Sequence, residues 1–171
     1  MLIRPAQAAD IPKMAELRSR EWETVEYWQT RIGSYLSGEG SPREALPDRA
    51  AFVAAILVAM EGDELVGFIA GHRTRRFGCD GELQWINVAR EKRGGGIAGK
   101  LVAELGAWFT GQGISRVCVD VAPENMSARK LYTRCGARPL KPHWMVWDDA
   151  RTMCGGGSGS GGSRVDTVTS S

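Results

Sequence analysis

The chain has 171 residues, of which 43% are hydrophobic and 25% charged, so it can bury the core of about one domain. This composition excludes an intrinsically disordered chain. The longest apolar run, from Ala50 to Met60, is shorter than the roughly 18 residues of a membrane-spanning helix, so we expect no membrane partner. A formal charge of +2 gives no indication of a nucleic-acid partner.

The cysteines and the N-terminus bear on the compartment of the protein. The four cysteines lie far apart, without a CxxC pair and without histidines at metal-ligand spacing, so we expect no bound metal. The first residues lack the apolar core of a signal peptide. We therefore expect a cytoplasmic protein with free thiols. The cysteines are Cys79, Cys118, Cys135 and Cys154.

A change of composition after Cys154, to glycine and serine, marks the end of the folded region. Such a segment buries too little apolar surface to offset its loss of conformational entropy. We expect one domain over residues 1–150 and a flexible tail over 151–171, which is either native or a remnant of cloning.

Apolar periodicity and helix caps predict the element order β-α-α-β-β-β-α-β-α-β. Asp10, followed by Pro12, is the expected N-cap of the first helix. The polar residues 61–64 predict a hairpin whose strands pair antiparallel. The expected strands are residues 2–5, 54–60, 65–72, 82–88, 115–121 and 143–147, and the expected helices are residues 11–20, the first part of 19–49, 97–111 and about 126–135. The third helix carries the apolar stripe Ile97, Leu101, Leu105 and Trp108, with Val102 beside it.

The segment between the strand at 82–88 and the helix at Ile97 reads RGGGIAGK from Arg93 to Lys100. Successive backbone amides at a helix N-terminus bind anions, and glycine lets the backbone approach a phosphate closely. The loop therefore predicts a phosphate site. The simpler interpretation is a flexible glycine turn.

Two nucleotide-binding motifs also match this loop. Gly94-x-Gly96-x-x-Gly99 fits a dinucleotide fingerprint, but five residues separate it from the preceding strand, where that fold requires a direct connection. This interpretation stays as an alternative. Gly94-x-x-x-x-Gly99-Lys100 resembles a Walker loop, but Leu101 occupies the position of the magnesium-binding Ser or Thr. This leucine excludes the Walker-loop interpretation.

The pattern Arg93-x-x-Gly96-x-Ala98 resembles the pyrophosphate-binding signature of the GNAT superfamily of acyl-CoA-dependent N-acyltransferases. A second pattern typical of the same superfamily, Asn125-x-x-Ala128-x-x-Leu131-Tyr132-x-x-x-Gly136, follows downstream. The resemblance covers most of residues 1–150 and implies an α/β fold with a central, mostly antiparallel mixed sheet flanked by helices. Ala137 and the additional Gly95 depart from the usual pattern without removing a backbone contact.

The resemblance implies that acetyl-CoA is the cosubstrate and that no metal is needed. The loop amides would hold the pyrophosphate, and the backbone at the end of the strand at 82–88 would pair with the pantetheine arm. By this resemblance the cofactor-binding residues are Asn87, Val88, Arg93, Gly94, Gly95, Gly96, Ile97, Ala98 and Asn125.

Two side chains are candidates for proton transfer. Tyr132 matches the position of the general acid that protonates the departing thiolate, although an ordinary packing role is the alternative. Glu82 is a candidate general base acting through water, or else a solvated carboxylate. By strand alternation Glu82 would share a face with Gln84 and Ile86. Neither motif has a cysteine at one of its defined positions, and no cysteine is paired with a histidine in the sequence, so we expect direct attack in a ternary complex rather than a covalent acyl-enzyme.

The expected acceptor is a primary amine of a small molecule or a peptide. Residues 20–49 contain four Arg and six acidic residues, which gives a formal charge of −2. If this segment covers the acceptor, its negative charge would favour a cationic amine. A solvated amphipathic helix, however, has the same composition. A non-catalytic acyl-CoA-binding module is the alternative function. Exposed strand edges and the aromatic strand at 143–147 make a homodimer one candidate assembly.

Overall fold

The computed structural model describes residues 1–38 and 53–155, and a single seven-stranded sheet runs through them in the order β1-β2-β3-β4-β5-β7-β6. The only parallel neighbours in it are β4 and β5; the other pairs are antiparallel. The strands are β1 (Leu2–Pro5), β2 (Ala54–Glu61), β3 (Glu64–Arg73), β4 (Gly81–Val88), β5 (Val117–Asp120), β6 (Arg138–Lys141) and β7 (Trp144–Trp147). The helices are α1 (Ile11–Ser19), α2 (Val25–Leu36), α3 (Ile97–Gly111) and α4 (Met126–Arg134), with short 3-10 turns η1 (Ala8–Asp10), η3 (Arg76–Gly78), η4 (Arg90–Lys92) and η5 (Ala150–Gly155).

This architecture confirms the predicted α/β class, the mostly antiparallel sheet and the hairpin of β2 with β3. The strand β6 was not predicted, because it is a four-residue, largely exposed edge strand that contains Pro139. Asp10 does not cap α1 through its side chain. Its carboxylate accepts instead from the Gln7 backbone amide at 2.7 Å and pairs with Arg4 at 2.8 Å. The expected loop over residues 39–49 lies outside the described residues.

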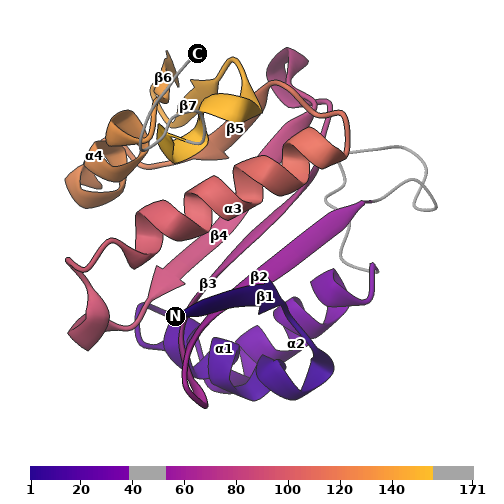
Figure 1. The fold of residues 1–171 in the computed structure, drawn as a ribbon, viewed down its shortest axis with the longest axis vertical. Coiled ribbons are helices and arrows are strands. Elements are labelled where there is room, and N and C mark those ends of the chain that lie inside the picture. Colours follow the sequence, from indigo (N-terminus) through magenta and orange to yellow (C-terminus); the bar gives the residue numbers. More distant parts are fainter. Residues whose placement is uncertain (39–52, 156–171) are drawn as a thin grey trace.

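Helices cover both faces of the sheet (Figure 1). The helix α3 packs on one face through Leu101, Leu105 and Phe109, all fully buried. Phe109 fills the place predicted for Trp108, which is only partly buried. The helices α1 and α2 pack on the other face, where α2 buries Trp28, Ile32 and Tyr35 at a spacing of four and three residues. Each such side chain contributes about 1.5–3 kcal/mol by leaving water.

The parallel neighbours β4 and β5 separate halfway along β4. Only Gly81–Leu83 pair with β5, at Val117–Val119. In the described part of the chain no strand pairs with residues 84–88 on that side, so their backbone forms an open edge inside the sheet. An extended chain can add to such an edge as a further strand.

A β-bulge in β4 changes which residues share a face. Ala70 of β3 pairs with Trp85 and Gly71 pairs with Leu83, so Gln84 is the extra residue. Because of this bulge Glu82 lies on the α1–α2 face together with Trp85, whereas Ile86 packs in the α3 core. The prediction that Glu82 and Ile86 share a face is therefore wrong.

The folded region extends beyond residue 150. Residues 150–155 form η5, whose Ala150 and Met153 are buried in the α3 core, while the expected tail from residue 156 onward lies outside the described residues. A disulfide joins Cys135, at the end of α4, to Cys154, so the expectation of free thiols is wrong for this pair. Cys79 and Cys118 are free and buried. Within the described ranges, no helix is long and apolar enough to cross a bilayer.

The contact of η5 with α3 gives a first prediction. A Cβ on Gly106 would lie 2.8 Å from both the Ala150 carbonyl oxygen and the Met153 Cβ, whereas a Cβ on Gly111 would meet no atom within 4 Å. We expect Gly106→Ala to lower the free energy of unfolding by about 1–3 kcal/mol and Gly111→Ala to raise it by about 0.5 kcal/mol. Urea denaturation of both variants measures this; equal stabilisation by both would contradict the packing of η5 on α3.

Candidate active site

The glycine loop before α3 exposes a row of unused backbone amides. Gly94 and Gly96 have φ angles of 88° and 87°, which only glycine adopts without strain. The first helical bond at this end runs from the Lys100 amide to the Gly96 carbonyl at 3.1 Å. In the described structure the six amides of residues 94–99 donate no hydrogen bond, and α3 has no N-capping side chain. Six free amides at the positive end of a 15-residue helix can hold an anion.

The side chain of Arg93 attaches this loop to the sheet. Its Nε donates to the Val88 carbonyl at 3.0 Å, and its Nη2 donates to Glu21 Oε2 at 3.0 Å. Gly94, Gly95, Gly96, Ile97 and Ala98 thus lie at the end of β4, next to its open edge. In this arrangement the guanidinium orients the loop, and the backbone amides are the groups that remain for a ligand.

Asn87 and Val88 lie on the open edge of β4, as the proposed pantetheine contact requires. The Asn87 side chain faces α1, where its Oδ1 accepts from Arg18 Nη1 at 2.8 Å. Sequence reasoning missed Arg18, because a single arginine on an amphipathic helix resembles any solvated residue. Asn125 lies elsewhere, at the start of α4, where its Oδ1 accepts from the Ala128 amide at 3.2 Å. Its side-chain oxygen is therefore a helix cap in this structure.

The phenol of Tyr132 is almost fully buried on α4 and packs edge-on against Trp147, with 5.6 Å between the ring centroids. Burial raises the pKa of Tyr132 well above its ordinary value, the nearby charge of Arg18 works against that shift, and Asp120 adds to it. The hydroxyl makes no hydrogen bond to another described residue. Tyr132 is therefore a protonated phenol at neutral pH with its proton available for donation.

Glu82 is a buried carboxylate on the α1–α2 face. Its Oε1 lies 3.2 Å from Arg76 Nε and 3.7 Å from His72 Nε2. Burial raises the pKa of Glu82, and the charge of Arg76 opposes this shift. Burial also lowers the pKa of His72 to about 4, so this ring is neutral at pH 7, and its Nδ1 lies 2.9 Å from the Tyr35 hydroxyl. A carboxylate with a raised pKa is a suitable proton acceptor.

Asp120, at the exposed end of β5, connects the two candidate catalytic groups electrostatically. Its negative charge raises the pKa of both Glu82 and Tyr132. These groups come from three elements, β4, β5 and α4, that meet where β4 and β5 separate. Asp120 acts on both, although Glu82 and Tyr132 are 50 residues apart in the sequence.

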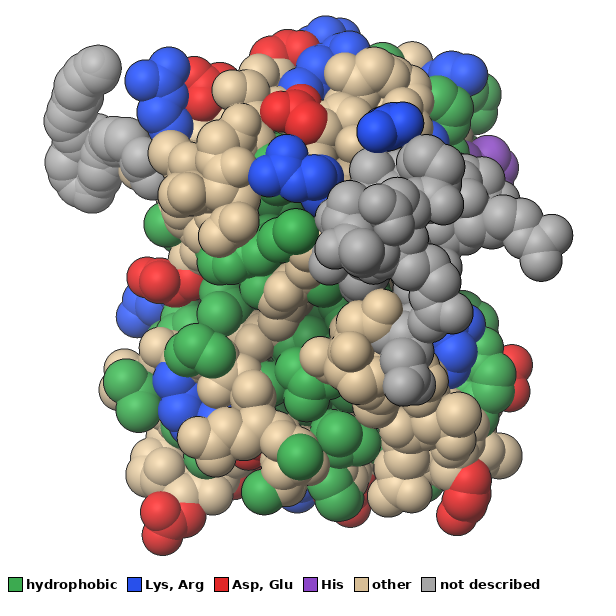
Figure 2. Space-filling view, turned by 90° about the vertical axis from the view of Figure 1, so that its right-hand side faces the viewer, with side chains coloured by type: hydrophobic (Ala, Val, Ile, Leu, Met, Phe, Trp, Pro, Cys, Tyr) green, Lys and Arg blue, Asp and Glu red, His purple; other side chains and the backbone are tan. Residues whose placement is uncertain are grey.

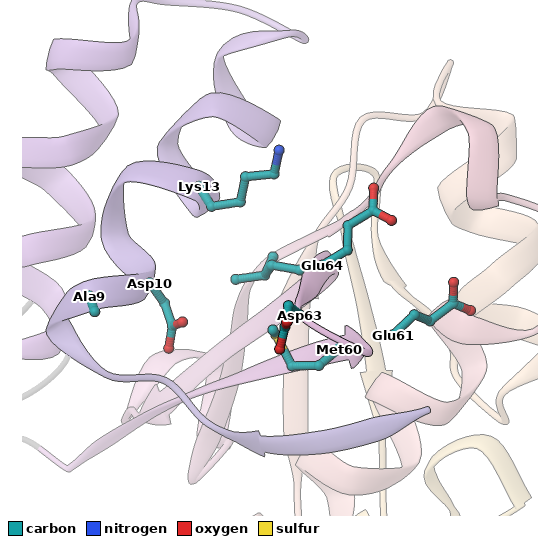
Figure 3. A pocket seen from close by; sticks show the side chains of 8 residues that line it. Ala9, Asp10, Lys13, Met60, Glu61, Asp63 and Glu64 are labelled. Atoms are coloured by element: carbon teal, nitrogen blue, oxygen red, sulfur yellow. The ribbon is translucent and has the colours of Figure 1, made fainter.

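A hollow lies on another part of the surface, between the start of α1 and the turn from β2 to β3 (Figure 3). Its lining includes Asp10, Lys13, Glu61 and Asp63 and none of the predicted site residues. Glu61 is paired with Lys92 of η4 at 2.8 Å. The hollow is therefore distinct from the glycine loop and from the open edge of β4.

Comparisons with known proteins agree with this fold. The model of the acetyltransferase (GNAT) family matches residues 11–137. A curated relative, the uncharacterized N-acetyltransferase YobR of Bacillus subtilis (strain 168), is 35% identical over 63 residues, which is 37% of this chain and 26% of that protein. The chain thus matches about a quarter of the length of this relative.

Solved structures extend the likeness over most of the chain. A ribosomal-protein-alanine N-acetyltransferase from Brucella melitensis superposes with a TM-score of 0.67 at 22% identity, covering 86% of this chain and 99% of the other. The PaiA N-acetyltransferase of Thermoplasma acidophilum, solved in complex with coenzyme A, gives a TM-score of 0.58 at 19% identity over 85% and 96% of the two chains. At these identities the likeness establishes a common fold.

Proposed function

Because this chain belongs to the GNAT acetyltransferase family, we propose that it transfers the acetyl group of acetyl-CoA to a primary amine of a small molecule or peptide. The observation that carries this proposal is the row of six unused amides at the N-terminus of α3, next to the open edge of β4. The amides suit the pyrophosphate of acetyl-CoA, and the edge suits its extended pantetheine arm. No metal takes part in the proposed reaction.

In the proposed reaction the amine nitrogen attacks the thioester carbonyl directly within a ternary complex. The new C–N bond forms as the C–S bond breaks. Glu82 accepts the proton of the amine, directly or through water, and Tyr132 gives its proton to the departing thiolate of coenzyme A. The raised pKa of each group supports its role, because a raised pKa makes the carboxylate a stronger base and keeps the phenol protonated.

A non-catalytic acyl-CoA-binding module is the second candidate, because it would need the same loop and edge. Turnover separates the two. We expect the protein to release free coenzyme A thiol from acetyl-CoA when a panel of primary amines is supplied, with the acetylated amine detected by mass spectrometry. Binding of acetyl-CoA with no thiol release over the whole panel would favour the module, and binding of NADH without acetyl-CoA would favour a dinucleotide site.

We also propose a homodimer and a cytoplasmic location. Support for a contact surface comes from the face shown in Figure 2, where hydrophobic side chains gather in a central band while most charged side chains lie above and below it. Sedimentation velocity measures the assembly state, and a monomer at micromolar concentration would contradict the dimer.

A further inference from the structure

Four aromatic side chains form a connected cluster between α1, α2 and β4, which we call the aromatic cluster. Trp28 is its centre, with ring centroids 5.7 Å from Trp22, 5.0 Å from Tyr27 and 5.6 Å from Trp85. All three contacts are edge-on. Trp85 belongs to the part of β4 that has an open edge, so the cluster lies on the α1–α2 side of the candidate active site.

Two arginines lie against this cluster. The Arg18 guanidinium is 4.9 Å from the Trp28 ring centroid and 5.5 Å from that of Trp22. The Arg31 guanidinium lies 5.6 Å from the Trp85 centroid and 6.0 Å from that of Trp28. The rings hold both cations by cation–π attraction, and the N–H groups in the plane of each guanidinium can form hydrogen bonds.

Neither arginine has an anionic partner in the described part of the chain. Arg18 donates to the neutral Asn87 Oδ1 at 2.8 Å, and Arg31 donates to the Tyr27 hydroxyl at 3.0 Å. Within residues 1–38 and 53–155, neither forms an ion pair, and the buried Nε of Arg18 has no hydrogen-bond partner. The nearby carboxylate of Glu21 accepts instead from Arg93 Nη2 at 3.0 Å.

The positive charges of Arg18 and Arg31 therefore lie close together without a described carboxylate to neutralise them. Burial lowers the pKa of Arg18; electrostatic interaction with Tyr132 and Glu21 opposes that shift, and Arg31 adds to it by like-charge repulsion. An arginine stays protonated at neutral pH, and a partly buried cation without a counter-ion is unfavourable. An anion that reached both guanidinium groups would remove the repulsion and satisfy the free N–H of Arg18.

We propose that Arg18 and Arg31 form an anion-binding subsite for the acceptor, and that the acceptor is a small amine that also carries a carboxylate. This inference rests on the proposed acetyl transfer. Arg18 contacts Asn87 on the open edge of β4 and acts electrostatically on Tyr132, so a carboxylate held there keeps the amine near the reacting thioester. The acidic count of residues 20–49 pointed to a cationic acceptor only if these residues cover it, whereas the groups that the aromatic cluster holds beside β4 are two arginines.

The test compares amino acids with their α-amides, which have the same side chain and α-amine but lack the carboxylate. Initial rates of thiol release are measured with acetyl-CoA for the twenty pairs, using the wild type, Arg18→Gln, Arg31→Gln and, as matched control, Arg20→Gln on the exposed surface of the same region. We expect kcat/KM for the preferred amino acid to exceed that of its amide by about tenfold or more. Either subsite variant should remove this preference, and Arg20→Gln should keep it.

Binding of the products gives a second readout that needs no turnover. Calorimetry with N-acetyl amino acids, in the presence of coenzyme A, should show binding by the wild type that is about tenfold weaker in Arg18→Gln and Arg31→Gln. Thermal unfolding of each variant verifies that it is folded, and the exposed Arg31 provides a variant with little packing to lose.

The outcomes distinguish the two proposals. Equal or faster acetylation of the amides would overturn the subsite while leaving acetyl transfer intact, and so would an amino-acid preference that survives both variants. Failure to bind acetyl-CoA, or release of no thiol with any amine, would overturn the proposed function. In that case the absence of binding by every N-acetyl amino acid would overturn the subsite as well.

Discussion

Replacing Gly96 by glutamate is expected to raise the Kd for acetyl-CoA by about a hundredfold or more. A Cβ at Gly96 would enter open space in which it meets no atom within 4 Å, directly beside the free amides of the loop. A carboxylate there competes for these amides and repels the pyrophosphate. At an effective dielectric constant of about 20, two like charges about 4 Å apart repel each other by several kcal/mol. Isothermal titration calorimetry measures the loss.

The matched control for this experiment is Gly96→Gln. Any side chain at this position is strained by the φ angle of 87°, at a cost of about 1–2 kcal/mol. Glutamine has the shape of glutamate without its charge, so the difference in Kd between the two variants isolates the electrostatic repulsion. If both variants bound acetyl-CoA as the wild type does, the glycine loop would be a structural turn and the phosphate-site interpretation would be wrong.

Local chemistry explains why the glycine loop and the overall α/β order could be predicted. The loop depends on residues 93–100 alone, because glycine and a following helix N-terminus determine where the amides point. The helices and most strands follow from periodicity within each segment. Such features need no knowledge of how distant parts of the chain meet.

Long-range packing explains what the sequence did not reveal. The face on which Glu82 lies depends on a bulge at Gln84 that exists only in the pairing of β4 with β3. The contact of Arg18 with Asn87 joins residues 69 positions apart. The disulfide of Cys135 with Cys154 forms because η5 folds back over the end of α4, where the Cys154 amide donates to the Cys135 carbonyl at 2.8 Å. Alternation and spacing carry no information about such contacts.

Tyr132→Phe is expected to lower kcat about a hundredfold or more, the usual contribution of a general acid, while the Kd for acetyl-CoA stays unchanged. The phenyl ring keeps the edge-on contact with Trp147, and the hydroxyl has no described hydrogen-bond partner to lose, so the melting temperature should change little. Steady-state kinetics and thermal unfolding measure the two effects. An unchanged kcat would leave Tyr132 with the packing role alone.

The pH profile shows whether Tyr132 and Glu82 act as a pair of acid and base. A general acid loses activity as the pH rises through its pKa, and burial puts the pKa of Tyr132 above the ordinary value of 10, so the phenol itself imposes no alkaline limb below about pH 10. A general base loses activity as the pH falls through its pKa, and the raised pKa of Glu82 puts that acid limb above the ordinary 4.5. Tyr132→Phe should therefore lower the whole profile and keep the acid limb, whereas Glu82→Gln should remove the acid limb. An acid limb that persists in Glu82→Gln would assign the proton acceptor to another group, with Asp120 the nearest candidate because its charge acts on both residues.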